Sequence, residues 1–236
     1  MNPARAVSTC DSNKAKRPTA TAMKKKACES LARALLPYLT EYVYAKKANA
    51  ICSVPVGSVF KGIIFESSGF SAAAFYPNAF AQPLYVPSDS FTLTFGKRLL
   101  GNWHYEPGQE ESLAKQLIES MHTESAFKLL EDLSTPDKMA LNLNKYHPSP
   151  QDPYLQRAVA YSFAVSGRFE EALAWLDECR KSLHELQSSQ PMLRWPALLL
   201  NEVTKFRELV ASDRTAATEH LAKWTEDTRA KLHLPA

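Results

Sequence analysis

One pair of residues in the sequence has the spacing of a metal site. Glu119 and His122 read E-x-x-H inside an expected helix, which places a carboxylate and an imidazole on the same helix face. A di-metal helical bundle needs two such units and further carboxylates, whereas this unit occurs once. The other histidines and the four cysteines are scattered, with no C-x-x-C pair of the kind that zinc sites show. The sequence therefore predicts neither a metal site nor a bound cofactor.

Motifs for phosphate binding and nucleophilic catalysis are missing from the sequence as well. Gly62 and Gly69 are isolated, and no stretch reads G-x-x-x-x-G-K-[ST]. Gly69-Phe-Ser71 begins like the nucleophile elbow G-x-S-x-G but lacks the closing glycine. We therefore expect no catalytic residues and a protein that is not an enzyme. The alternative is a small hydrolase with its site between sheet and helices, near Glu66, Asp89, Trp103 and His104.

Aromatic and acidic residues near the expected strand ends are the candidates for contacts with a partner protein. Such residues lie where a sheet meets solvent, and aromatic side chains are enriched among the residues that dominate interfaces. The candidates are Glu66, Tyr76, Tyr85, Asp89 and Trp103. Pro83 and Pro87 flank Leu84-Tyr85-Val86, so the sequence predicts an edge strand at that position.

The elements that must position these residues begin with a helix and a set of strands. From Lys24 to Leu39, apolar residues recur at helical spacing. From residue 41 to residue 100 the chain is rich in Tyr, Val, Ile, Phe and Thr and is interrupted by Gly and Pro, which is typical of strands. Short turns favour an antiparallel meander, with the helix against one face. We expect strands near Tyr42–Ala45, Ala50–Pro55, Phe60–Glu66, Ser71–Tyr76, Gln82–Val86 and Phe91–Phe95.

After Gly101 the strand signals end and helix signals replace them. Thr135 and Asp152 each precede a proline, which is the arrangement of an N-cap residue before the first helical position. Ser212 or Asp213 is suited to cap the last helix. We expect helices near Glu110–His122, Ser125–Leu133, Pro136–Lys145, Pro153–Ser166, Arg168–Leu186, Pro196–Ala211 and Arg214–Lys231.

The charge distribution separates a tail from a folded body. The 236 residues carry a net charge of +3, but residues 1–26 hold seven Lys/Arg against one Asp, which leaves −3 for the rest. A mildly acidic body predicts no nucleic-acid partner. No apolar run approaches the roughly 18 residues of a membrane span, and no secretory signal is recognisable, so we expect a cytoplasmic protein without membrane contact. The predicted class is α+β: a disordered basic tail (1–22), a helix plus antiparallel sheet unit (23–105) and a helical unit (106–236).

One helical segment has a specific pattern of packing residues. It resembles a tetratricopeptide-type hairpin, in which small residues let two antiparallel helices approach and a glycine ends the first helix. Gln156 departs from the family, which usually has a large aromatic there, and the spacing to the next turn argues against a regular array. The resemblance implies protein binding through a concave face. The matching residues are Val159, Ala160, Phe163, Gly167, Phe169, Ala172, Leu173 and Leu176.

The strand-rich part resembles a group of bacterial protein families. The motifs are Phe60-Lys-Gly-Ile-Ile-Phe-Glu66, Gln82-Pro-Leu-Tyr-Val-Pro87 and Phe95-Gly-Lys-Arg-Leu99. Over Lys24–Leu100 this arrangement is similar to families that include immunity proteins, which are encoded beside antibacterial toxins delivered by type VI secretion or related systems. The resemblance implies a non-enzymatic cytosolic protein that binds and blocks a cognate toxin. A helical-repeat adaptor or scaffold is the alternative within the binding class.

Overall fold

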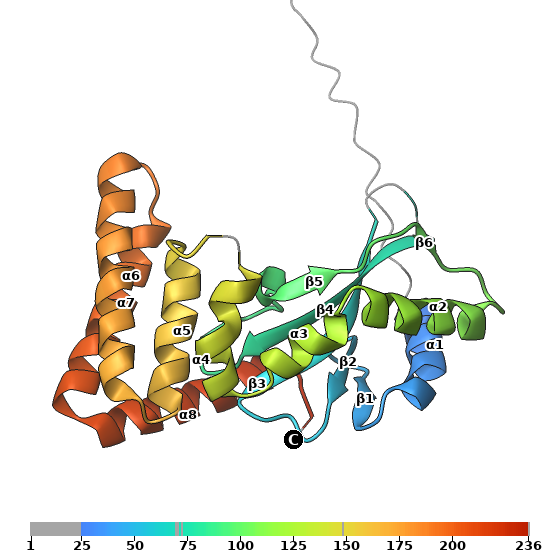
Figure 1. The fold of residues 1–236 in the computed structure, drawn as a ribbon, viewed down its shortest axis with the longest axis horizontal. Coiled ribbons are helices and arrows are strands. Elements are labelled where there is room, and N and C mark those ends of the chain that lie inside the picture. Colours follow the sequence, from blue (N-terminus) through green and yellow to red (C-terminus); the bar gives the residue numbers. More distant parts are fainter. Residues whose placement is uncertain (1–24, 69–70, 72, 148, 236) are drawn as a thin grey trace, which may run out of the picture.

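A computed structural model describes residues 25–68, 71, 73–147 and 149–235, so the predicted tail at residues 1–22 lies outside it. Within this part the chain forms a six-stranded antiparallel sheet and eight α-helices, seven of which follow the sheet. The predicted α+β class is confirmed (Figure 1). The strands are β1 (Tyr42–Ala45), β2 (Ala50–Ser53), β3 (Val59–Ser67), β4 (Ala74–Pro83), β5 (Gly96–Arg98) and β6 (Trp103–His104).

The helices agree closely with the predicted ranges. Two short 3-10 turns, Leu36–Tyr38 and Leu93–Phe95, accompany them. The helices are α1 (Lys25–Leu35), α2 (Glu110–Thr123), α3 (Ala126–Asp132), α4 (Pro136–Tyr146), α5 (Pro153–Val165), α6 (Phe169–Ser189), α7 (Trp195–Ser212) and α8 (Arg214–Lys231).

The sheet is the predicted meander, in the order β1-β2-β3-β4-β5, and β6 also pairs with β4. Glu66 lies opposite Tyr76, and Asn78 lies opposite Arg98. Because side chains alternate along a strand, these four residues and His104 share one face of the sheet, which we call the outer face. The opposite face, the inner face, contacts the helices that flank the sheet.

The predicted strands Ser71–Tyr76 and Gln82–Val86 have the wrong bounds, because one long strand, β4, spans residues 74–83 and includes part of each. Residues 84–86 form a turn after β4, so the predicted edge strand there is also wrong, and Phe91–Phe95 is partly a 3-10 turn. β4 contains Pro77, which has no backbone N–H to donate to a neighbouring strand. The Pro77 carbonyl accepts a hydrogen bond from the N–H of Leu99 at 2.9 Å. The N–H and C=O of a strand residue point to the same side, so the position without an N–H lies on the side of β4 that pairs with β5 and β6. There it falls in the gap after β5 ends and before β6 begins, where no strand needs the donor.

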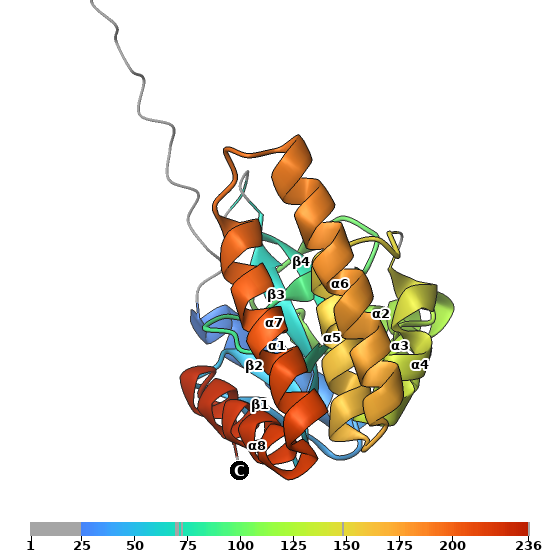
Figure 2. The ribbon, with the colours of Figure 1, turned by 90° about the vertical axis from the view of Figure 1, so that its left-hand side faces the viewer.

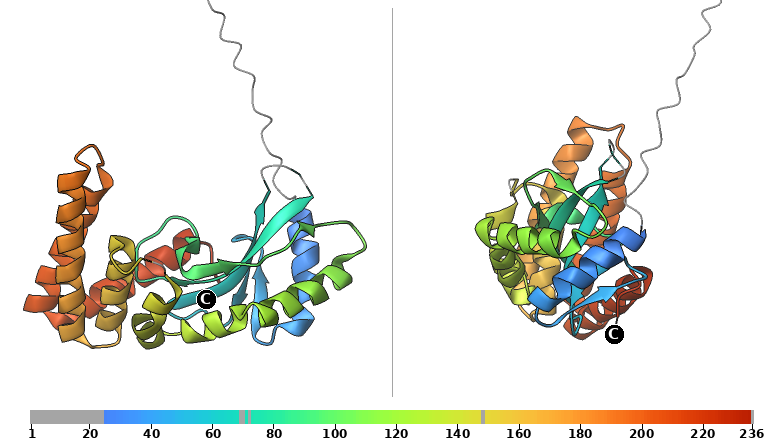
Figure 3. Two further views of the ribbon diagram at one scale, coloured as in Figure 1. Left: turned by 45° about the horizontal axis from the view of Figure 1, so that its top comes forward. Right: turned by 90° about the vertical axis from the view of Figure 1, so that its right-hand side faces the viewer.

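The inner face holds most of the core on the sheet side. The structure places α1 and α2 across this face, with α3 beside β4 and β5 (Figure 3, right). Helices α2 and α3 follow residue 105, the predicted end of the sheet unit, yet they pack on α1 and on the sheet. Burying a large aliphatic side chain is worth roughly 1.5–3 kcal/mol, so this layer fixes the sheet firmly. Core residues here include Leu31, Leu35, Ile63, Phe75, Leu117 and Leu129.

The outer face is covered at one end by the C-terminal part of the chain. Phe60, Phe80 and Leu84 form a second apolar cluster with Leu232, which follows α8. Helix α8 runs beneath the other helices back toward the sheet, and the chain ends there (Figures 1 and 2). Arg229 of α8 donates from Nη2 to the carbonyl of Val56 at 2.8 Å. The C-terminal end thus connects the helices with the sheet.

The helical part has the predicted caps. Thr135, Asp152 and Asp213 accept hydrogen bonds from backbone N–H groups in the first turns of α4, α5 and α8, at 3.3, 2.9 and 3.0 Å. The last of these identifies Asp213, and not Ser212, as the cap of α8. These caps satisfy N–H groups that a helix leaves without intrahelical partners.

Helices α5 and α6 form the antiparallel hairpin that the tetratricopeptide-like pattern predicts. Gly167 lies between them with φ of +76°. The N–H of Arg168 donates to the carbonyl of Phe163 at 2.9 Å, and the N–H of Gly167 donates to the carbonyl of Ala164 at 3.0 Å. This is the Schellman pattern, which requires the left-handed conformation that glycine adopts without strain. The following hairpin, α6–α7, stands upright at one end of the molecule (Figure 3, left).

Candidate functional site

Two of the residues predicted to contact a partner lie together on the outer face. Glu66 is exposed and accepts a hydrogen bond from Nδ2 of Asn78 at 3.0 Å. The guanidinium carbon of Arg98 lies 3.3 Å from the ring centroid of Tyr76, in a cation–π contact. Because Glu66 and Tyr76 are register partners, the structure brings them side by side in a small polar patch.

Tyr85 and Trp103, which were predicted to contact a partner, are buried. The Tyr85 hydroxyl lies 2.6 Å from Oγ of Ser162 in α5, and burial raises the pKa of this phenol well above its usual range. Trp103 is 8% exposed and donates from Nε1 to the carbonyl of Leu99 at 3.3 Å. Neither side chain is available on the surface, so the structure gives both of them a packing role. Tyr85 in particular links the sheet to the helices.

The residues of the hydrolase alternative do not converge. Asp89 forms an ion pair with Lys231, whose Nζ lies 2.7 Å from Oδ1, close to the C-terminal end. Glu66 and His104 lie on the outer face, whereas the neighbouring Trp103 points to the inner face. The four candidate residues are therefore distributed over three places.

The described residues include no cluster of three or more His, Cys, Asp or Glu side chains suited to a metal ion. The ring of His122, from the E-x-x-H pair, packs on Phe127 with centroids 4.7 Å apart. The three described cysteines are buried. Burial raises the pKa of Cys52 to about 11 and that of Cys179 to about 12. Both thiols are thus protonated at neutral pH and poor nucleophiles.

A pocket of about 260 Å³ lies where the loop after β4 meets helix α5, and we call it the inter-unit pocket. Its walls are mostly apolar, and Arg157 is the one charged residue among those that line it. The α5 side chains are one turn apart, so Tyr154 and Arg157 point to the same side of the helix. The lining residues are Gln82, Pro83, Val86, Pro87, Ser88, Thr92, Thr94, Phe95, Tyr154, Arg157 and Ala158.

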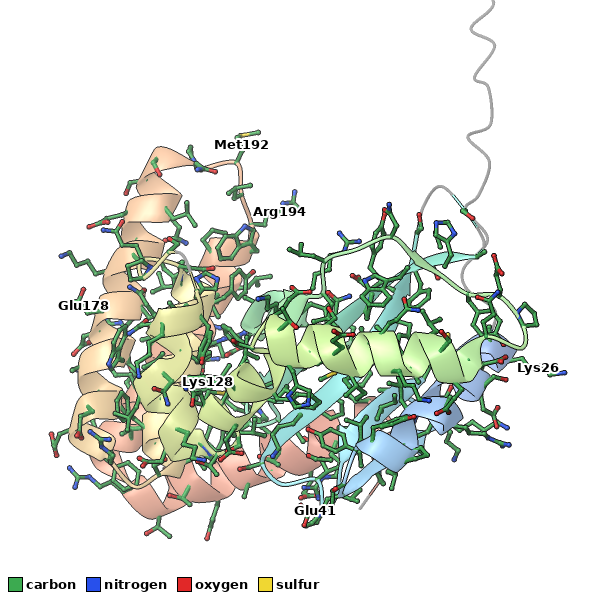
Figure 4. The ribbon with its side chains drawn as sticks, turned by 45° about the vertical axis from the view of Figure 1, so that its right-hand side comes forward. Lys26, Glu41, Lys128, Glu178, Met192 and Arg194 are labelled. Carbon is green, nitrogen blue, oxygen red and sulfur yellow. The ribbon has the colours of Figure 1, made fainter. Side chains whose placement is uncertain are left out.

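Exposed or half-buried apolar side chains lie on α5, on α7 and at the tip of the α6–α7 hairpin. The ring of Tyr154 stacks on Trp195 of α7, with centroids 4.9 Å apart. Leu198 follows Trp195 by one helical turn, and Met192 marks the tip of the hairpin in Figure 4. We call this surface the apolar rim. Its members are Tyr154, Met192, Leu193, Trp195 and Leu198, and Met192 and Leu198 are 91% and 72% exposed.

A charged network fixes the helices below the rim. Nη1 of Arg157 donates to Oε1 of Glu202 in α7 at 3.0 Å, and the Tyr161 hydroxyl donates to the same oxygen at 2.9 Å. Burial, and then the charge of Glu202, raise the pKa of Tyr161 well above its usual range. Arg157, which lines the inter-unit pocket, thus connects α5 to α7.

Local sequence patterns do not predict the inter-unit pocket or the apolar rim. Tyr154 and Trp195 belong to different helices, and only the packing of the hairpins brings them together. One signal was present: residues 191–200 read PMLRWPALLL, an apolar run that begins before the helix and exceeds what one buried helix face requires.

Comparison of the chain with protein-family models, with curated proteins and with solved structures finds no match. In the described part of the chain, no helix is both long and apolar enough to cross a bilayer. The candidate site is an apolar pocket lined by one arginine, next to exposed aromatic and aliphatic side chains.

Proposed function

We propose that this chain is a non-enzymatic, cytoplasmic protein-binding protein that neutralises an antibacterial toxin by direct contact. The apolar rim and the inter-unit pocket form the contact surface in this proposal. The resemblance of residues 24–100 to families with immunity proteins supports the toxin as the partner. Helices α5 and α7 supply the surface, as the concave face of a helical repeat does.

The observation that carries this proposal is the clustering of exposed apolar side chains. Seven large apolar side chains are exposed in the described chain, and four of them belong to the apolar rim. A contiguous exposed apolar surface marks an interaction site more often than scattered single residues do. Trp, Tyr and Arg, the residue types that dominate binding energy at interfaces, occur together here as Trp195, Tyr154 and Arg157.

The decisive experiment is co-expression of this chain with the toxic product of the adjoining gene. We expect growth to be rescued and a stable 1:1 complex to form. Leu198→Asp should weaken the complex by roughly 30-fold or more, because it places a charge at the centre of the contact. Leu141→Asp is the matched control, since Leu141 is also exposed, at 53%, but lies on α4 outside the rim.

Two results would contradict parts of this proposal. If no complex forms and growth is not rescued, the toxin-neutralising role is wrong. If Leu141→Asp and Leu198→Asp weaken the complex equally, the rim is not the contact surface. A helical-repeat adaptor would also use the rim, but its partner would not be toxic and growth would not depend on the complex.

A further inference from the structure

We infer that the partner segment bound at this surface is acidic and carries one apolar side chain that enters the inter-unit pocket. This inference rests on the proposed function, namely that the surface binds a protein. It adds the chemistry of the bound segment, which follows from the size of the pocket and from the charges around it.

The size of the pocket favours a single side chain. Its volume is about 260 Å³, and its walls are mainly Pro, Val, Phe, Tyr and Ala side chains. Pockets that hold drug-sized molecules are usually larger, at roughly 300–1,000 Å³. An aliphatic or aromatic side chain from a bound peptide fits such a space and removes apolar surface from water.

Arg157 provides a hydrogen-bond donor at the wall of the pocket. Its side chain is 12% exposed, and Nη1 is the one of its nitrogens that donates to Glu202. Nη2 makes no hydrogen bond with any described residue, although the group lines the pocket. Nε is buried and makes no hydrogen bond with a described residue, so Nη2 is the nitrogen that can donate a charge-assisted hydrogen bond to an acidic side chain of the partner.

The charged side chains at the margin of the surface differ in whether they already have a partner within the protein. Asp152 accepts from the N–H of Tyr154 and lies 3.4 Å from His147, Glu202 is paired with Arg157, and Asp89 is paired with Lys231.

Arg194, by contrast, has no ion pair with a described residue. It stands directly before Trp195 and projects from the tip of the hairpin in Figure 4. Because the three carboxylates named above have partners and this arginine has no ion pair with a described residue, the charge available beside Trp195 is positive.

The first test uses three short fluorescein-labelled peptides and fluorescence anisotropy. One alternates Ser and Asp around a central Leu, the second alternates Ser and Lys around a central Leu, and the third has the acidic sequence with Ser in place of Leu. We expect the acidic peptide with Leu to bind at least roughly tenfold tighter than either of the others. Equal binding of the basic peptide, equal binding without Leu, or no binding of any peptide would each overturn the inference.

Two variants then assign the contacts. Thr94→Trp places a large side chain at an exposed position of the pocket wall and should abolish the advantage of the Leu peptide. Arg194→Glu should slow association of the acidic peptide about tenfold at low salt, and the difference should shrink at about 0.5 M NaCl. Lys181→Glu is the control with the same change in net charge, because Lys181 is exposed on α6 and does not line the pocket.

Failure of this inference can be distinguished from failure of the proposed function. If the toxin complex forms and depends on Leu198 but the acidic peptide does not compete with the toxin, the function stands and the acidic segment is wrong. If the acidic peptide binds in the pocket but no toxin complex forms, the pocket chemistry stands and the toxin partner is wrong.

Discussion

At the scale of single residues, the contact between Tyr85 and Ser162 connects the sheet to the helices. Oγ of Ser162 donates to the carbonyl of Ala158 at 2.6 Å, so the Tyr85 hydroxyl is the donor in its own 2.6 Å contact with Ser162. The remaining acceptor near the phenol is the sulfur of Met139, at 3.6 Å. Removing the donor, Tyr85, therefore has a different consequence from removing the acceptor, Ser162.

We predict that Ser162→Ala destabilises the fold more than Tyr85→Phe. Tyr85→Phe removes one hydrogen bond, at about 1 kcal/mol, and leaves Ser162 bonded to Ala158. Ser162→Ala leaves a buried phenol without an oxygen acceptor, which costs about 1–3 kcal/mol. Free energies of unfolding from urea titrations measure the difference, and Ser166→Ala, which removes a similar bond within α5 at 2.9 Å, is the control. Equal losses for Ser162→Ala and Tyr85→Phe would contradict this donor assignment.

The buried thiols predict a loss of stability at alkaline pH. Burial raises the pKa of Cys52 to about 11 and that of Cys179 to about 12, from an ordinary value of 9.0. Below pH 9 both states keep the thiols protonated, so the stabilisation is fully present there. Between pH 9 and the folded-state values the unfolded chain releases protons first, and the free energy of unfolding should fall by about 1.4 kcal/mol per thiol for each pH unit.

Two measurements check this prediction. Urea titrations at pH 8 and pH 10.5 should differ, and Cys52→Ala should show a smaller difference between these pH values than the unchanged protein. The described thiols should also react with an alkylating reagent only after unfolding. Rapid alkylation of Cys52 or Cys179 in the native protein would show that these thiols are accessible.

At the scale of elements, the helices could be predicted from sequence because their ends carry local signals. Thr135 and Asp152 accept the expected capping hydrogen bonds, and Gly167 ends α5 in the left-handed conformation. Strand β4 could not be predicted in the same way. From sequence, Pro77 indicates the end of a strand, because proline cannot donate a hydrogen bond to a neighbouring strand. In the structure Pro77 lies beside the gap between β5 and β6, where no strand requires that hydrogen bond.

The candidate site depended even more on tertiary structure. Strand ends are local features, so the sequence can place Glu66 and Tyr76 near them, whereas the burial of Tyr85 follows from the packing of the turn after β4 against α5. Tyr154 and Trp195 meet through the packing of two helices that the sequence describes separately. Local patterns therefore predict the helices well, and surfaces built from several elements poorly.

The close approach at Gly62 gives a prediction for the sheet. A Cβ atom there would lie 2.4 Å from Cζ of Phe60 and 2.6 Å from the carbonyl oxygen of Ile51. Since backbone and a buried ring must both shift, Gly62→Ala should lower the free energy of unfolding by about 1–3 kcal/mol. Gly57→Ala is the control, because nothing lies within 4 Å of its added Cβ. Thermal unfolding of both variants makes the comparison, and equal melting temperatures would contradict the tight fit of Phe60 over Gly62.

At the scale of the whole molecule, the two ends of the described chain cover opposite faces of one sheet. Helix α1 packs on the inner face, and the residues after α8 pack on the outer face. Arg229 donates to the carbonyls of Val56 and Gly57, at 2.8 and 3.2 Å, so the last helix is bonded to the loop between β2 and β3. The hairpins that present the apolar rim are therefore held to the sheet at Tyr85 and again at the C-terminal end.

This double attachment predicts that sheet and helices unfold together and that Leu232 is part of the reason. Leu232 is 5% exposed among Phe60, Phe80 and Leu84, so Leu232→Ala should cost about 2–5 kcal/mol. His233→Ala, at the next and exposed position, should cost little. Circular dichroism follows mainly the helices, and hydrogen exchange of β3 and β4 amides follows the sheet. Both should report one coincident transition, shifted equally by Leu232→Ala. If that substitution instead loosened the sheet while the helices kept their original stability, the two parts would be independent units, and the pocket between them would not have a fixed shape.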